Sequence, residues 1–202
     1  MKKGILSISI AVALLTGCAA TVKPVDIPQV SNLKGIEANS TDVKAYISDF
    51  SINLPSPKIG QAKTGTLCVG GTDLTWTGHT PTVAAMDTTV KSTFKDLNYN
   101  VSSSLLKEKA RNEANVLIAG SVTDMKGNLC LSIDGQKGDV YAEVSWELYN
   151  KKNDQTLTLK TQGTSSNPKF VQAGDTELFV ASVKMATLNL LANPEVHKLL
   201  NN

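Results

Sequence analysis

The feature that most constrains the fold is a run of alternating side chains between residues 140 and 149. Its apolar positions are Val140, Ala142, Val144, Trp146 and Leu148, and the positions between them are Tyr141, Glu143, Ser145 and Glu147. Successive side chains of a strand point to opposite faces, so the two sets would lie on opposite sides of a sheet. The run therefore predicts a strand with one face in a core and the other in solvent.

Two apolar helices are predicted on either side of the main strand region. In the first, Thr80 is the expected cap and Pro81 the first helical residue. Its apolar residues recur at three- and four-residue steps, at Val83, Met86, Val90, Phe94 and Leu97. The second is expected over Thr176–Leu191, ended by Asn193-Pro194, with one or two further turns over Glu195–Leu200.

The remaining segments complete an α+β pattern. Strands are expected at Val43–Phe50, around Thr66–Val69, at Asn98–Val101, Val116–Met125, Leu129–Ile133 and Thr156–Thr164, with a polar helix near Ser104–Asn112. Turn chemistry is present at Asp134-Gly135 and at Lys137-Gly138-Asp139. This order predicts one globular domain over residues 41–202, a mainly antiparallel sheet with two principal helices packed on one face.

The amino terminus has the pattern of an export signal. Lys2 and Lys3 precede an apolar run from Ile5 to Leu15, and a small residue, Gly17, follows. The segment Leu15-Thr16-Gly17-Cys18 resembles the lipobox of bacterial lipoproteins. That resemblance implies removal of residues 1–17 as a signal peptide and acylation of Cys18 with fatty acids such as palmitate. The alternative is a buried core helix that ends in a cysteine.

A tether is predicted between the acylated cysteine and the domain, over residues 18–40. Pro24 and Pro28 exclude a helix there. No further run of eighteen apolar residues follows, so membrane attachment would come from the lipid. Ala19 follows Cys18, which in the enteric sorting convention implies the outer membrane, facing the periplasm. The inner membrane and the cell surface are the alternatives.

Cys68 and Cys130 remain once Cys18 is assigned to the lipid. An even pair in an oxidising compartment favours a disulfide. The alternative is two unpaired buried thiols. A metal site is not indicated, because no Cys-x-x-Cys or Cys/His cluster flanks either residue.

Charge and aromatic content argue against several classes of partner. The chain has 20 Lys+Arg against 18 Asp+Glu, and two of the lysines belong to the predicted signal peptide. The mature chain would therefore be close to neutral, which gives no electrostatic reason to expect nucleic acid. Aromatic residues make up only 5% of the chain, few for stacking on single strands or sugars. No cofactor is predicted.

The chain resembles the YajG-like family of bacterial envelope lipoproteins. The resemblance rests on Leu15–Cys18, a Pro-containing tether at 24–28, the amphipathic helix leading into the Tyr99–Val101 strand, and strands between Val116 and Thr164. It also includes a final helix with the tail Val196-His197-Lys198-Leu199-Leu200. A looser likeness runs to the curli-secretion lipoprotein and the TolB amino-terminal domain, around Ala114–Val122. It implies the fold called anticodon-binding-like.

Few residues are candidates for chemistry or contact. Trp76 and His79 lie in a loop-rich section, Pro55–Thr80, where an exposed aromatic side chain would mark a partner contact; core packing and an ordinary loop histidine are the alternatives. Glu143 and Glu147 share a strand face, so a paired-carboxylate site is conceivable, but a solvated, cross-strand-paired face is the simpler interpretation. No Gly-x-Ser-x-Gly elbow occurs.

The sequence thus favours a lipid-anchored, non-enzymatic envelope protein. We expect it to act through protein–protein contacts as an accessory, assembly or structural factor, using the Pro55–Thr80 section or an exposed sheet edge. A second hypothesis is a small-ligand or lipid carrier with an apolar pocket between sheet and helices. A third is an enzyme that uses Glu143 on peptidoglycan or sugar.

Overall fold

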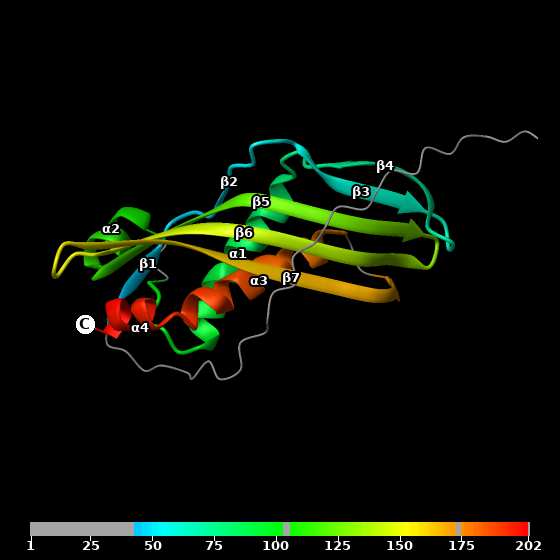
Figure 1. Ribbon diagram of the computed structural model, residues 1–202. Coiled ribbons are helices and arrows are strands. Elements are labelled where there is room, and N and C mark those ends of the chain that lie inside the picture. The colour runs from blue at the N-terminus through cyan, green and yellow to red at the C-terminus, as the bar shows by residue number, and fades with distance from the viewer. Residues whose placement is uncertain (1–42, 103–105, 173–174, 202) are drawn as a thin grey trace, which may run out of the picture.

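The computed structural model describes residues 43–102, 106–172 and 175–201, and it is an α+β fold with one mixed sheet and four helices (Figure 1). The strands are β1 (Ala45–Ile47), β2 (Ser51–Ile52), β3 (Lys58–Thr64), β4 (Val69–Thr75), β5 (Val116–Ser132), β6 (Gly135–Asn150) and β7 (Gln155–Val171). The helices are α1 (Thr80–Asp96), α2 (Lys107–Glu113), α3 (Asp175–Leu191) and α4 (Pro194–Asn201). The predicted signal peptide, Cys18 and the tether lie outside the described residues.

The sheet is built around β5. Its order is β4-β3-β5-β6-β7, and β1 and β2 also pair with β5. The pairs β5–β6 and β6–β7 are antiparallel, as expected, and so is the unexpected pair β3–β4. The strands β1, β2 and β3 run parallel to β5. The first half of β5 is bordered by β1 and β2, and its second half by β3.

Several predicted strand boundaries are wrong because long-range pairing overrides local turn chemistry. Residues 116–133 were expected as two strands, but β5 continues through Lys126-Gly127-Asn128, since β3 and β6 pair with it there. Lys137-Gly138-Asp139 lies inside β6 rather than in a turn. The expected Thr66–Val69 strand is wrong in the opposite sense: residues 65–68 form the turn between β3 and β4, and β4 begins at Val69.

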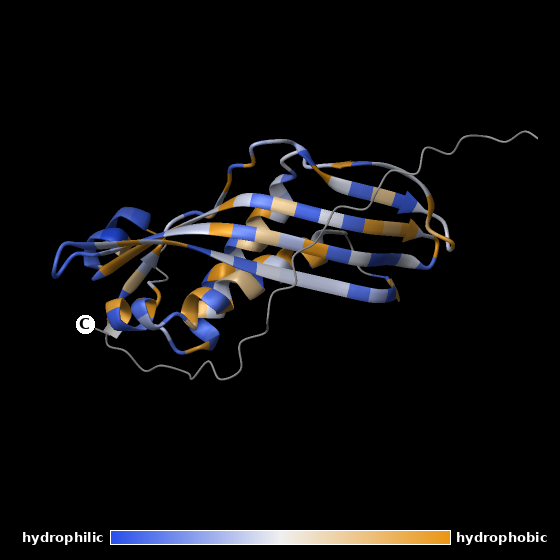
Figure 2. Cartoon of the chain, viewed as in Figure 1, coloured by the Kyte–Doolittle hydropathy of each residue, from blue (hydrophilic) through white to orange (hydrophobic). Residues whose placement is uncertain are grey.

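The core lies between one face of the sheet and the helices α1 and α3, which Figure 1 shows behind the strands. All five apolar positions of the alternating run in β6 have no exposed surface. In α1, Met86, Val90 and Phe94 are also fully buried, while Val83 and Leu97, the residue that follows the helix, are partly exposed. The two principal helices therefore cover one face, as the patterns predict, and Figure 2 shows the alternating hydropathy along the strands.

A chain of buried hydrogen bonds ties α3 to the sheet. The indole Nε1 of Trp146 donates to Thr161 Oγ1 at 2.7 Å, and this hydroxyl donates to the Ala186 carbonyl oxygen at 2.7 Å. The neighbouring Gly163 permits the close contact, because a Cβ there would lie 2.0 Å from the Ser182 carbonyl oxygen. Trp146 is thus both a core side chain and part of the link between β6, β7 and α3.

The two ends of the sheet are built differently (Figure 1). At one end, which we call the α2 end, β5 begins beside β1 and α2, and α4 packs near the end of β6 through a 3.2 Å hydrogen bond from Asn150 Nδ2 to the Leu199 carbonyl oxygen. At the other, the disulfide end, the β3–β4 turn and the β5–β6 turn lie side by side. The predicted disulfide, Cys68–Cys130, joins them there with Cα atoms 5.5 Å apart.

Among the described residues, every helix is too short or too polar to cross a membrane.

Candidate functional site

The sheet face opposite α1 and α3 is polar. Its outward side chains on β6 and β7 include Tyr141, Glu143, Glu147, Lys160 and Gln162. We call it the open face. In the described part of the chain no group of three or more potential metal-ligating residues is found on it or elsewhere.

A hollow of about 530 Å³ lies on the open face at the α2 end. Two tyrosines from different strands line it, Tyr46 of β1 and Tyr149 of β6, and both are partly exposed. Leu117 and Ala119, the outward side chains of β5, also line it, as does Arg111 of α2. The charged residues at its border are Asp49, Arg111 and Glu147. We call this the tyrosine hollow.

The register explains why these side chains meet. Tyr46 pairs with Leu117 across the parallel β1–β5 ladder, and Leu117 pairs with Tyr149 across the antiparallel β5–β6 ladder. The three side chains therefore form one row across three strands. The Tyr149 hydroxyl donates to Asp154 Oδ1 at 2.8 Å, and this carboxylate raises the pKa of Tyr149.

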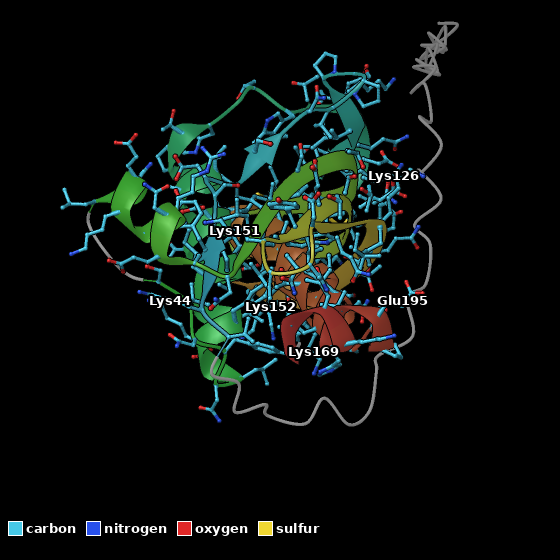
Figure 3. All side chains as sticks on the ribbon, turned by 90° about the vertical axis from the view of Figure 1, so that its left-hand side faces the viewer. Lys44, Lys126, Lys151, Lys152, Lys169 and Glu195 are labelled. Atoms are coloured by element: carbon cyan, nitrogen blue, oxygen red, sulfur yellow. A yellow bond between two sulfur atoms is a disulfide. The ribbon has the colours of Figure 1, made fainter. Side chains whose placement is uncertain are left out.

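Helix α2, which supplies Arg111, is fixed almost entirely by polar contacts. Its single buried residue is Ala110. Lys107 Nζ lies 2.5 Å from Asp49 Oδ2, and Lys44 Nζ lies 2.7 Å from Glu113 Oε2. Lys151 Nζ donates to the Arg111 carbonyl oxygen at 2.5 Å, close to the negative end of the helix. Figure 3 looks onto this end, with Lys44 and Lys151 labelled.

The ion pairs of α2 shift the pKa values of the carboxylates involved. The hydrogen bond from Lys107 lowers the pKa of Asp49, and the hydrogen bond from Lys44 lowers that of Glu113. The Asp49 hydrogen bond in turn raises the pKa of Lys107. The position of α2, and with it one wall of the tyrosine hollow, therefore depends on charge.

The sequence candidates Trp76 and His79 are brought together elsewhere. They line a separate hollow of about 250 Å³ at the start of α1, with Phe179 of α3. Trp76 is partly buried, with its ring centroid 6.3 Å from that of Phe179. His79, rather than the expected Thr80, is the residue preceding α1, and its Nδ1 lies 3.0 Å from Thr82 Oγ1.

Glu143 takes part in a polar cluster on the open face. Its carboxylate accepts hydrogen bonds from Lys160 Nζ at 2.8 Å and from Thr123 Oγ1 at 3.0 Å. The Lys160 hydrogen bond lowers the pKa of Glu143, whereas a general acid needs a raised one. The adjacent Tyr141 is buried, and burial raises its pKa to about 12. Cross-strand pairing thus accounts for this cluster.

The tyrosine hollow is the site that sequence reasoning missed. Tyr46 and Tyr149 are separated by about a hundred residues, and neither lies in a recognisable motif. The available signal was alternation: Tyr149 falls on the outward set of the β6 pattern. It could not be placed beside Tyr46 without the parallel pairing of β1 with β5.

No protein-family model matches the chain, and no curated protein matches its sequence. Several solved structures are similar at low identity. A protein from Xanthomonas campestris is 12% identical, with a TM-score of 0.47 over 77% of this chain and 87% of that one. The PelC dodecamer from Paraburkholderia phytofirmans is 14% identical, with a TM-score of 0.41 over 77% and 92%. Lipoprotein GNA1162 from Neisseria meningitidis is 9% identical, with a TM-score of 0.38 over 75% and 99%.

Proposed function

We propose that this chain is a lipid-anchored, non-enzymatic protein of the bacterial envelope that acts by binding another protein. The anchor would be the acylated Cys18, which follows the signal-like segment ending at Gly17. Ala19 favours the outer membrane with the domain in the periplasm. In this role the chain is an accessory, assembly or structural factor of an envelope complex.

The observation that carries the proposal is the tyrosine hollow. Tyrosine and arginine are the side chains most enriched at the energetic centres of protein interfaces, because they combine large contact area with hydrogen-bonding groups. Here Tyr46, Tyr149 and Arg111 border a concave surface whose floor includes Leu117 and Ala119. The Arg111 guanidinium is in no ion pair with another described residue, so its charge is available to a partner.

The carrier hypothesis receives less support from the packing. A carrier would need an apolar cavity between the sheet and the helices. Large side chains fill that space instead: Trp146, Phe94, Met86, Ile118 and Leu148 all have less than 2% of their surface exposed. The tyrosine hollow, by contrast, opens on the outer side of the sheet, where a protein segment has access.

The proposal is tested by filling the hollow. Ala119 is exposed at its floor, so Ala119→Trp should occupy the hollow without disturbing the core. Acylated full-length protein would be cross-linked in intact envelopes and captured by an affinity tag. We expect the variant to lose its cross-linked partner, with an affinity loss of about thirtyfold or more, the size of one interface hot spot.

The matched control is Thr164→Trp, which places the same side chain on the open face opposite Tyr141, away from the hollow. It should retain the partner. Capture that is unchanged in Ala119→Trp, or equally reduced in both variants, would contradict the assignment of the hollow. Arg111→Ala with Lys152→Ala as its control repeats the comparison by removing charge instead of adding bulk.

A further inference from the structure

The disulfide end exposes large aliphatic side chains. Leu67 is 82% exposed, Val69 64%, Leu131 39% and Ile133 93%. Leu67 lies in the β3–β4 turn and Ile133 in the β5–β6 turn, and the other two adjoin these turns. Figure 2 shows hydrophobic colour returning at this end of the sheet. We call these four residues the apolar tip.

The apolar tip is held together by the fold. The Gly65 amide donates to the Leu131 carbonyl oxygen at 2.8 Å, and the Cys68–Cys130 disulfide joins the two turns. Gln172 Nε2, which follows β7, donates to the Ile133 carbonyl oxygen at 3.3 Å. The exposed side chains are therefore presented by fixed turns.

Isoleucine at the tip of a two-residue hairpin turn is unusual, because such turns favour Asn, Asp and Gly. Exposed aliphatic side chains on two turns that a disulfide joins are of the kind that marks an interaction surface.

Lysines surround the apolar tip. Lys63 and Lys137 lie on either side of Cys130 in the β3–β5 and β5–β6 ladders, and Lys137 Nζ lies 4.6 Å from the Phe170 ring centroid. Lys169 is exposed on β7. The β5–β6 turn and the start of β6 carry two acidic residues, Asp134 and Asp139, so the three lysines leave an excess of one positive charge. A hollow of about 330 Å³ is lined by Lys63, Lys137 and Asp139, whose carboxylate accepts a hydrogen bond from Ser166 Oγ, and it is large enough for a phosphate-bearing headgroup.

We propose that the apolar tip inserts into the surface of an anionic lipid bilayer, with Lys63, Lys137 and Lys169 at the level of the lipid phosphates. Aliphatic side chains with a basic rim match this interface, because shallow insertion buries apolar area while lysines attract anionic headgroups. A second attachment of this kind would fix the orientation of the domain on the membrane.

The length of chain before the domain permits this contact. The 17 residues of β5 span about 55 Å between the α2 end, where Val43 lies, and the apolar tip. Residues 18–42 can span at most about 85 Å. A domain acylated at Cys18 can therefore place its tip on the membrane that holds its anchor. Contact of the tip with this particular membrane rests on the proposed acylation of Cys18.

The test measures bilayer contact at the two ends of the domain. Acylated full-length Ile133→Trp would be reconstituted in vesicles of phosphatidylethanolamine and phosphatidylglycerol, with and without brominated lipid. Asn153→Trp, in the exposed β6–β7 turn at the α2 end, is the matched control. Trp76 and Trp146 contribute equally to both. We expect at least a twofold quenching of the added tryptophan at position 133, and little at 153.

Absent quenching at 133, or equal quenching at both positions, would overturn the proposal; burial of the tip against a protein would give the first result. Acylation is scored separately by the mass of the amino-terminal peptide, and binding of the unacylated chain to the same vesicles tests the tip even if the anchor fails. In that assay Lys63→Glu with Lys137→Glu should weaken binding about tenfold or more, whereas Lys152→Glu should change it little. Equal binding by the two variants would contradict the role of the rim.

Discussion

The two ends of the sheet present surfaces by different physical means. At the disulfide end, a covalent bond and backbone hydrogen bonds hold two turns with aliphatic side chains outward. At the α2 end, a seven-residue helix with one buried side chain is held against the sheet by lysine contacts. The first surface is apolar with a basic rim; the second combines tyrosines with an arginine. We therefore expect the two ends to respond to different conditions and, under the two proposals above, to contact different partners.

This difference has a simple physical basis. A disulfide is insensitive to salt and to moderate pH, whereas exposed ion pairs are screened by salt and lost when a partner is neutralised. The disulfide end should therefore keep its shape across conditions in which α2 loosens. A reducing agent should instead loosen the disulfide end and leave α2 in place.

The largest expected effect comes from removing the disulfide. The double variant Cys68→Ala with Cys130→Ala opens a loop spanning 62 residues, and the chain-entropy estimate puts the loss of unfolding free energy at about 4 kcal/mol. Denaturant unfolding of the double variant and the oxidised parent measures it. A loss of unfolding free energy below about 1 kcal/mol would show that the disulfide contributes little to stability.

The second effect is local to α2. Lys151→Met removes the donor to the carbonyl oxygens of Arg111 and Asn112. A charge-assisted hydrogen bond of this type contributes about 1–2 kcal/mol, so amide exchange over Lys107–Glu113 should accelerate roughly tenfold. Exchange in the middle of β6 should stay unchanged. Uniform acceleration through the sheet would mean that α2 is not a separate unit.

The third effect is the pH dependence of α2. Because the pKa values of Asp49 and Glu113 are lowered from 3.8 and 4.5, their ion pairs stabilise α2 above these values, and the contribution is lost as the pH falls towards the lowered pKa values. The raised pKa of Lys107 makes its contribution complete below 10.5, and this contribution is lost as the pH rises from 10.5 through the raised pKa. Exchange of the α2 amides, corrected for intrinsic rates, should therefore accelerate below about pH 4, before the core opens. An α2 that stays protected until global unfolding would contradict this.

The smallest effect is expected in the middle of the open face, between the two ends. Lys160→Met breaks the ion pair with Glu143, in which the lysine is 61% exposed, so the loss of stability should stay below about 1 kcal/mol. The pKa of Glu143 should rise, because the Lys160 hydrogen bond is the largest cause of its lowered value. Carboxyl NMR titration of the parent and variant measures the change. If the pKa of Glu143 is the same in the parent and the variant, Lys160 is not the cause of its lowered value.

Much of the fold could be predicted because its strongest patterns are local. The alternation through Trp146 and the stripe through Val90 each point to one face, and both faces meet in the core. Other elements depend on distant partners. The hairpin β3–β4 is not predicted from the sequence, because Gly60, Gly70 and Gly71 interrupt its alternation of apolar and polar residues. Parallel pairing of β3 with β5 holds it in the sheet.

The surfaces were predictable to different degrees. Leu67 lies within the Pro55–Thr80 section that the sequence marks as a contact region, although Trp76, the expected contact, is partly buried against Phe179. Ile133 comes from a different hairpin, β5–β6, and the pairing of β3 with β5 brings it to the same tip. The tyrosine hollow depends wholly on strand register, since Tyr46 and Tyr149 lie in one row only because both pair with Leu117 of β5.

The most direct test compares the two ends within the same envelope. A photo-activated cross-linking residue would be placed at Glu147, at the border of the tyrosine hollow, or at Ile133, in the apolar tip, of the acylated full-length protein. We predict a discrete protein adduct from position 147, lost when Arg111→Ala is added, and adducts with lipid but no discrete protein adduct from position 133. A discrete protein adduct from position 133, with none from position 147, would contradict the assignment of protein binding to the hollow and lipid binding to the tip.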